Sequence, residues 1–205
     1  MKEYPSIVAA HGQQFAEFDA HLFEKLDGQN VRAQWSAKTG WYKFGSRHRL
    51  VELSDPEYGP AVEHFHAELG APLAALAKKT RARSLTVFME WFGPTSLGGF
   101  HTPGEELSLA VFDAFDPQKG FLSPNEFRKL FEDAVPTPRY LGPQRWTRGY
   151  VQRVRAGEVE SSFEGVVAKN YLGTRFQLSK AKTQAWLDAI HARFDPELAA
   201  KLANS

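Results

Sequence analysis

The feature that most constrains this chain is a lysine two residues before an Asp-Gly pair, in the segment Lys25-Leu26-Asp27-Gly28. Apolar and polar residues alternate around it from residue 21 to residue 35, which predicts strand structure on both sides of the lysine. A lysine amine can act as a covalent nucleophile once burial or nearby positive charge has lowered its pKa. The phosphorus atom of a nucleotide is a natural electrophile for such an amine.

Four further short motifs follow the lysine along the chain. Lys180 and Lys182 alternate along a predicted strand, so both side chains face one side of it. Each motif alone is weak evidence, whereas the occurrence of all of them in one order indicates a single family. The motifs are Phe88-Met89-Glu90-Trp91-Phe92-Gly93, Val111-Phe112-Asp113, Glu164-Gly165-Val166-Val167-Ala168-Lys169 and Lys180-Ala181-Lys182.

The ordered set resembles the covalent nucleotidyltransferase superfamily of ATP-dependent DNA ligases, RNA ligases and capping enzymes. Glu24 directly before the lysine and Asn30 five residues after it make the chain most similar to RNA ligases of the phage RNA ligase 2 type. Tyr4-Pro5-Ser6-Ile7 is also similar to the opening of that family's adenylylation domain. The resemblance extends from about residue 4 to residue 182.

The resemblance implies an ATP-dependent RNA ligase with a role in RNA repair. Lys25 would attack the α-phosphorus of ATP, expel pyrophosphate and form a lysyl-AMP intermediate. AMP would then pass to the 5′-phosphate of an RNA, and a 3′-hydroxyl would seal the strand with release of AMP. The implied cofactors are ATP as AMP donor and Mg²⁺ or Mn²⁺. DNA is the alternative to RNA as the polynucleotide that is sealed.

Five residues carry the implied chemistry of that reaction. Lys25 is the nucleophile, and Lys180 and Lys182 would hold the α-phosphate oxygens as negative charge builds on them. Asp27 would assist through a hydrated metal ion or the ribose, although a carboxylate before glycine is also good turn chemistry. Glu164 is the implied metal ligand, since Mg²⁺ is usually held by one or two carboxylates together with water and phosphate.

Three residues have implied roles in recognising the nucleoside. Glu90 would accept a hydrogen bond from the ribose, and Glu24 would accept one from the adenine N6 amine, which favours ATP over GTP. Phe112 would stack on adenine, with Phe115 as the alternative. An aromatic residue in a strand is more often part of a core, so the role of Phe112 follows only from the resemblance.

Three more residues have implied contacts with phosphate groups. Arg47, in the pair Ser46-Arg47, would contact the ribose or a strand phosphate with its planar guanidinium. Lys169 would face the phosphates, with a charge at a strand end as the alternative. Asn30 would lie near the terminal phosphate or the pyrophosphate leaving group.

Composition describes an ordinary globular protein of 205 residues with a formal net charge of +1, so no global basic field indicates nucleic-acid binding. Basic residues are concentrated locally. Gly28 to Val51 holds five Lys or Arg and no carboxylate, and Arg145 to Lys182 holds eight basic residues against three acidic ones. With no cysteine, disulfides are excluded. The N-terminus has no apolar signal core and no run has membrane-spanning length, so a cytoplasmic location is expected.

Predicted strands outnumber predicted helices, which favours an α+β fold with antiparallel sheets over a doubly wound fold. The resemblance makes this the ligase-type adenylyltransferase fold, with two sheets and flanking helices. The predicted elements are strands over 21–35 and 41–53, a helix over Asp55–Lys79, strands over Ser84–Phe92 and Leu107–Phe115, a helix from the capping box at Ser123 through Asp133, strands over Arg148–Arg155, Ser162–Asn170 and Thr174–Lys182, and helical segments at the end, interrupted near Phe194 by Pro196.

We expect residues 1–205 to form one adenylyltransferase domain with motifs over 24–182 and a C-terminal helical segment over 183–205. Only 23 residues follow Lys182, too few for the OB-fold domain of the superfamily. A partner protein, a homodimer or the Arg145–Arg155 segment would then have to grip the strand. A DNA nick ligase, a capping guanylyltransferase and a non-catalytic module that binds nucleotides or RNA ends remain alternatives.

Two patterns mimic metal sites. The segment from Phe115 to Glu126 echoes a calcium-binding EF-hand loop, but residues without side-chain oxygen ligands occupy the required positions, so we expect a turn and a helix cap. His64 and His66 are two residues apart in a predicted helix, and this spacing directs their rings away from each other.

Overall fold

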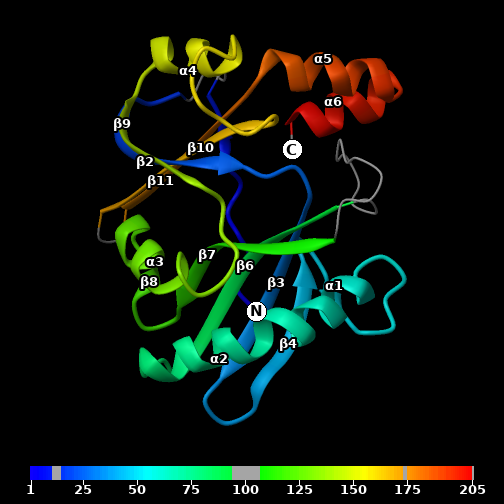
Figure 1. Ribbon diagram of the computed structural model, residues 1–205, viewed down its shortest axis with the longest axis vertical. Coiled ribbons are helices and arrows are strands. Elements are labelled where there is room, and N and C mark those ends of the chain that lie inside the picture. The colour runs from blue at the N-terminus through cyan, green and yellow to red at the C-terminus, as the bar shows by residue number, and fades with distance from the viewer. Residues whose placement is uncertain (11–14, 94–106, 173–174, 205) are drawn as a thin grey trace. The chain divides into compact units, whose positions relative to one another are not determined.

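The strands of this protein form two β-sheets, one in each of two units of the chain (Figure 1). The computed structural model describes residues 1–10, 15–93, 107–172 and 175–204. The first unit comprises Met1–Pro5 and Gly28–Thr137, and the second comprises Ser6–Asp27 and Pro138–Ser205. The predicted α+β class with antiparallel sheets is confirmed, with one short parallel strand pair as an addition.

The first unit contains a six-stranded antiparallel sheet in the order β5-β4-β3-β6-β7-β8. Alternate residues of the central strand β3 are buried, namely Val31, Ala33 and Trp35, as the alternating sequence pattern requires. The strands are β3 (Gln29–Ser36), β4 (Gly40–Ser46), β5 (Leu50–Val51), β6 (Ser84–Phe92), β7 (Ser108–Asp116) and β8 (Gly120–Phe121).

A helical segment packs on this sheet with several buried apolar residues, among them Phe65 and Leu73. It consists of α1 (Gly59–His64), a π-helical turn η1 (Phe65–Leu69) and α2 (Gly70–Lys79), within the predicted range Asp55–Lys79. The Phe65 ring is fully buried and lies edge-on to the rings of Trp41 and Phe44 of β4. The rings of His64 and His66 contact different aromatic residues, Trp91 and Phe44.

The segment that echoes a calcium loop is a turn followed by a helix cap, as predicted. Asp116 Oδ1 accepts from the Gln118 backbone N–H at 2.8 Å in the turn between β7 and β8. Ser123 and Glu126 then form the predicted capping box at the start of α3 (Pro124–Phe131).

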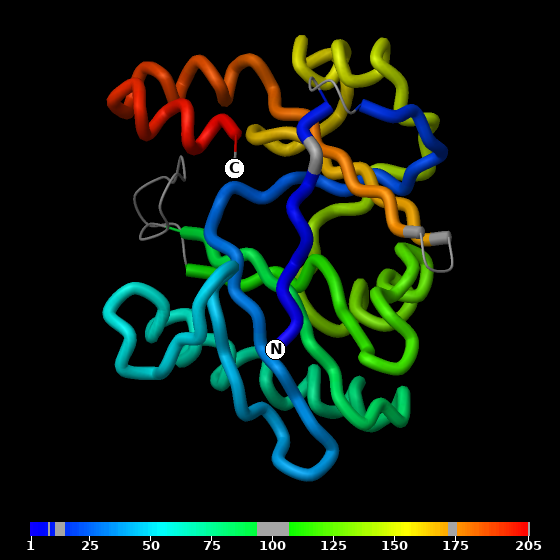
Figure 2. Tube along the Cα trace, turned by 180° about the vertical axis from the view of Figure 1, so that it is seen from behind, coloured from blue at the N-terminus to red at the C-terminus, as the bar shows by residue number. Residues whose placement is uncertain are grey.

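The N-terminal residues lie along the six-stranded sheet, where Figure 2 shows the blue end of the chain. The Tyr4 hydroxyl donates to Asp113 Oδ2 at 2.9 Å, and its ring contacts Phe88 and Phe112. Arg32 on β3 donates to the backbone oxygen of Lys2 at 2.8 Å. These contacts attach the first residues to β3, β6 and β7.

The second unit contains a five-stranded sheet in the order β1-β11-β10-β2-β9. Even-numbered residues of its strands, such as Leu22 and Val166, form a buried core with Val151 and Val154 of α4. None of the helices among the described residues is long and apolar enough to cross a membrane. The elements are β1 (Val8–Ala9), β2 (Phe18–Lys25), β9 (Tyr140–Trp146), α4 (Arg148–Arg155), β10 (Gly165–Leu172), β11 (Arg175–Lys182), α5 (Gln184–Arg193) and α6 (Pro196–Asn204).

The prediction of a strand over Arg148–Arg155 is wrong, because this segment is helix α4. The Thr147 side chain caps the helix by accepting from the Tyr150 backbone N–H at 3.1 Å. Val151 and Val154 are buried and three residues apart, which is helical spacing on one face. The sheet strand lies just before it, as β9, which the sequence analysis did not predict.

Gly165 occupies a position that only glycine can adopt without strain. Its φ is +145°, and a Cβ built there would lie 2.0 Å from the backbone oxygen of Ala181 on the neighbouring strand. Any side chain would therefore push β10 away from β11. The close approach brings the ends of β2, β10 and β11 together.

We expect Gly165→Ala to destabilise the protein by about 3 kcal/mol or more, since backbone strain adds to overpacking. Gly157→Ala is the matched control, because Gly157 has a φ of +72° but nothing within 4 Å of a built Cβ. That change should cost only about 1 kcal/mol of backbone strain. Urea unfolding of both variants measures the difference, and equal losses would contradict the steric account.

Candidate active site

Three strand ends meet at one place in the sheet of the second unit. Lys25 ends β2, Gly165 begins β10 and Lys182 ends β11. Gly165 is paired with Lys25 on one side and with Lys182 on the other. Glu164, which precedes the glycine, therefore contacts both lysines. Its Oε1 lies 2.7 Å from Lys25 Nζ and 3.2 Å from Lys182 Nζ.

The second oxygen of this glutamate has the properties of a metal ligand. The Glu164 side chain is 3% exposed, and its Oε2 is buried with no hydrogen-bond partner among the described residues. A buried carboxylate oxygen left unpaired is costly unless a cation or donor meets it. Mg²⁺ and Mn²⁺ prefer oxygen ligands and take their remaining ligands from water and phosphate. The residues present therefore fit such an ion.

Lys180 and Lys182 are both buried, and both donate to the C-terminal end of α6. Lys182 Nζ lies 2.6 Å from the backbone oxygen of Leu202, and Lys180 Nζ lies 3.5 Å from that of Asn204. The last carbonyl groups of a helix lack intrahelical partners and carry partial negative charge, so ammonium groups are favourable there. The sequence analysis did not predict this contact.

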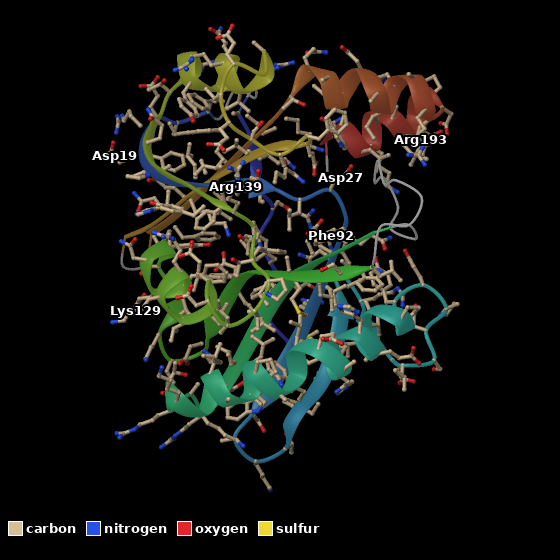
Figure 3. All side chains as sticks on the ribbon, in the orientation of Figure 1. Asp19, Asp27, Phe92, Lys129, Arg139 and Arg193 are labelled. Carbon is tan, nitrogen blue, oxygen red and sulfur yellow. The ribbon has the colours of Figure 1, made fainter. Side chains whose placement is uncertain are left out.

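A tryptophan that the sequence analysis missed connects two of the predicted residues. Trp186 of α5 donates from its indole Nε1 to Asp27 Oδ2 at 2.9 Å. Lys182 Nζ lies 4.2 Å from the centroid of the same ring, within cation–π range. Asp27, labelled in Figure 3, lies in the segment that follows β2. A tryptophan four residues after the second lysine of Lys180-Ala181-Lys182 is the sequence signal that could have indicated it.

Glu24 is oriented by an arginine that was also missed. Arg139 Nη2 lies 2.7 Å from Glu24 Oε1, and Arg139 also pairs with Glu160. The Glu24 backbone N–H donates to the Arg139 backbone oxygen at 3.0 Å. Successive residues of a strand point to opposite faces, so the structure does not bring the Glu24 carboxylate beside the Lys25 ammonium.

Lys169 shares a sheet face with Lys25. It is paired with His21, and β2 positions 21, 23 and 25 lie on one face. Its side chain is buried, and its Nζ lies 5.1 Å from the centroid of the Phe23 ring.

The other predicted residues belong to the first unit. Asn30 and Glu90 are paired across β3 and β6, and Asn30 Oδ1 is buried with no hydrogen-bond partner among the described residues. Arg47 follows β4 directly. Phe112 lies at a bulge of β7, and its ring packs edge-on against Tyr4 at a centroid distance of 4.9 Å. The ring of Phe115, the alternative, contacts Phe121.

Burial lowers the pKa of Lys182 from 10.5 to about 8. The negative charge of Glu164 opposes this effect, and the positive charge of Lys25 adds to it. Since the pKa is lower in the folded chain than in the unfolded chain, protonation of Lys182 opposes folding below pH 8, and this opposition disappears as the pH rises toward 10.5. Because of its burial, the Lys182 ammonium loses its proton at a pH closer to neutral than an exposed lysine does.

Several solved structures that resemble this chain are RNA ligases. An archaeal ATP-dependent RNA ligase matches with a TM-score of 0.67 and 16% identity, over 100% of this chain and 56% of that chain. A Naegleria gruberi RNA ligase variant without ligand matches with a TM-score of 0.63 and 16% identity, over 94% of this chain and 64% of that chain. Another variant of the same ligase, with ATP and Mn, matches with a TM-score of 0.62 and 16% identity, over 83% of this chain and 51% of that chain. At this identity the likeness shows the fold alone, which this chain shares with these RNA ligases.

The chain belongs to the RNA ligase family, because residues 20–187 match the model of that family. No curated protein sequence matches at a significant level. The chain spans between 51% and 64% of the length of the three solved ligases named above.

We expect an NMR titration of the lysine Cε resonances to show Lys182 titrating near pH 8 in the protein without nucleotide or metal. Glu164→Gln should lower this pKa further, because the carboxylate charge raises it. Glu158→Gln is the control, because the exposed Glu158 side chain pairs with Arg153 at 3.9 Å. This change should leave the pKa of Lys182 unaltered. A rise of the Lys182 pKa in Glu164→Gln would show that the assigned cause is wrong.

Proposed function

We propose that this protein is an ATP-dependent RNA ligase that acts through a lysyl-AMP intermediate on Lys25. The observation that carries the proposal is the buried cluster in which Glu164 Oε1 contacts both Lys25 and Lys182. The cluster contains the candidate nucleophile Lys25, the carboxylate of Glu164, whose Oε2 has no hydrogen-bond partner among the described residues, and Lys182, which would bind phosphate. Membership of the RNA ligase family supports the reaction class. Structures of Naegleria gruberi RNA ligase variants with ATP or AMP and Mn support the cofactors.

In the first step, the neutral amine of Lys25 attacks the α-phosphorus of ATP. The Nζ–P bond forms, the bond from phosphorus to the bridging oxygen of the β-phosphate breaks, and pyrophosphate leaves. The amine proton must be lost beforehand, and the 2.7 Å contact with Glu164 favours the protonated form. The contact must therefore loosen before attack.

Glu164 is the residue that would hold a divalent cation, through the orphaned Oε2. When bound, such an ion would neutralise phosphate charge and weaken the hold of the carboxylate on the Lys25 proton. Lys180 and Lys182 would stabilise the negative charge that develops on the α-phosphate oxygens. Asp27, to which the Trp186 indole donates, would assist through the hydrated metal ion or the ribose.

In the remaining steps, AMP passes from Lys25 to the 5′-phosphate of an RNA, and a 3′-hydroxyl displaces AMP to close the strand. Both are nucleotidyl transfers at phosphorus, so the same positive side chains would serve them. Lys169 would contribute a further positive charge from the face that carries Lys25. A partner protein or a second copy of the chain would help to hold the strand.

In the first unit, Asn30 and Glu90 lie side by side on neighbouring strands and would bind phosphate and ribose groups. The orphaned Oδ1 of Asn30 supports a ligand role for that side chain. Phe112, or else Phe115, would stack on adenine, and Arg47 would contact the ribose or a strand phosphate. Glu24, whose carboxylate is oriented by Arg139, would accept a hydrogen bond from the adenine amine.

We expect the purified protein, incubated with ATP and a divalent metal, to gain the mass of one AMP, and to lose it on addition of pyrophosphate. Lys25→Ala should show no adduct, because it lacks the nucleophile. Lys43→Ala, which removes an exposed lysine of β4, should form the adduct like the unmodified protein. Intact mass spectrometry is the measurement, and an AMP adduct on the Lys25→Ala variant would show that Lys25 is not the nucleophile.

We expect an RNA that already carries a 5′-adenylate to be sealed by Lys25→Ala, because only the first step needs the amine. Adding Glu164→Ala to this variant should lower the sealing rate by at least about tenfold, the effect of removing a group that stabilises the reacting phosphate. Adding Glu158→Ala instead should have no effect. Gel assays of ligated product measure the rates, and a DNA nick sealed faster than RNA would favour the DNA ligase alternative.

A further inference from the structure

The indole of Trp186 lies between two charged side chains of opposite sign. Its N–H donates to Asp27 Oδ2 at 2.9 Å, and the face of its ring lies 4.2 Å from Lys182 Nζ. Trp186 is 1% exposed. A buried indole N–H requires an acceptor, and a ring face attracts a cation, so one rigid side chain meets both needs at once.

The position of this indole is itself fixed by the start of α5. The Thr183 side chain accepts from the Trp186 backbone N–H at 3.1 Å and caps the helix. The Thr183 hydroxyl also donates to the Phe163 backbone oxygen at 2.6 Å. The Thr183 backbone N–H donates to the backbone oxygen of Glu164 at 2.9 Å. The helix that carries Trp186 is therefore attached to the same backbone that presents Glu164.

The indole contacts a charged side chain from the segment after β2 and another from the end of β11. It gives the Asp27 carboxylate a neutral donor and gives the Lys182 ammonium a ring face. Lys182 Nζ also lies 3.2 Å from Glu164 Oε1, which in turn lies 2.7 Å from Lys25 Nζ. The indole therefore connects Asp27 to the cluster that contains the candidate nucleophile.

We propose that Trp186 is a positioning residue for lysyl-AMP formation, which holds the Asp27 carboxylate in its reactive orientation beside the lysine cluster. The inference rests on the proposed function, because it assigns to Asp27 a part in the first step. It extends that function to a side chain outside all five sequence motifs, 159 residues from Asp27 in the chain.

The chain offers a matched control in Trp146. It lies in the same unit and is 0% exposed, but its Nε1 has no hydrogen-bond partner among the described residues. Trp186→Phe and Trp146→Phe thus make the same change at equally buried positions. Only the first removes an indole N–H that has an acceptor, and it keeps an aromatic face for Lys182.

The first measurement is the single-turnover rate of lysyl-AMP formation. Trp186→Phe should lower this rate about tenfold, as expected for the loss of one hydrogen bond to a charged group. Trp146→Phe should retain the unmodified rate. In the Asp27→Ala background, adding Trp186→Phe should cause no further loss, because each change alone already removes this hydrogen bond. Equal rates for the two phenylalanine variants, or losses that multiply in the double variant, would overturn the inference.

The second measurement does not depend on activity and leaves the tryptophan in place, so it remains informative if Trp186→Phe fails to fold. The chain has five tryptophans, whose indole N–H resonances can be followed by NMR. Asp27→Asn should shift the Trp186 indole resonance and leave that of Trp146 unchanged, and equal responses would overturn the contact. An unmodified protein that forms no adduct while the Trp186 resonance shifts would refute the ligase proposal. A normal adduct rate in Trp186→Phe would refute the positioning role alone.

Discussion

The sharing of one buried carboxylate oxygen by two lysines is the interaction on which this site depends. Removing charges from water is costly, and the cost is recovered only where the charged groups meet closely. Here Glu164 Oε1 lies within 3.2 Å of both Lys25 Nζ and Lys182 Nζ. The cluster therefore holds two ammonium groups at one carboxylate oxygen in a poorly solvated place, and a phosphate is the kind of group to which such ammonium groups donate strongly.

Backbone geometry, more than side-chain chemistry, makes this sharing possible. Gly165 is paired with Lys25 and Lys182 at once, and a Cβ on this residue would lie 2.0 Å from the backbone oxygen of Ala181. Thr183 then attaches α5 to the same turn through its side chain and its backbone N–H. The glycine in the Glu-Gly pair is thus as necessary for the cluster as the glutamate.

Local sequence patterns predicted much of the fold, because they report local causes. The capping box at Ser123 depends on residues close in sequence, and that prediction is confirmed. The strand predicted over 21–35 is correct only in part, because residues 26–28 divide it into β2 and β3, which belong to different sheets. The strand predicted at Arg148–Arg155 failed because Val151 and Val154 fit a helix period, which is hard to distinguish in eight residues. The ordered motifs indicated the lysine and glutamate cluster only through the family resemblance.

What the sequence did not reveal are contacts between residues far apart in the chain. Trp186 reads as an ordinary core residue of a helix. Its place four residues after Lys182 is a local signal, but it does not indicate Asp27 as the partner. Arg139 lies 115 residues from Glu24, and no spacing rule connects the two. The bond from Lys182 to the Leu202 backbone oxygen is equally invisible, because every residue has a carbonyl group.

That last contact changes what a binding constant for this chain would mean. In the proposed function, phosphate oxygens would compete with the end of α6 for the same ammonium protons of Lys180 and Lys182. The helix end is an internal competitor, present at a fixed and high local concentration. Apparent nucleotide affinity would equal the intrinsic affinity reduced by the work of releasing the helix, so a change confined to α6 would alter it without touching the ligand.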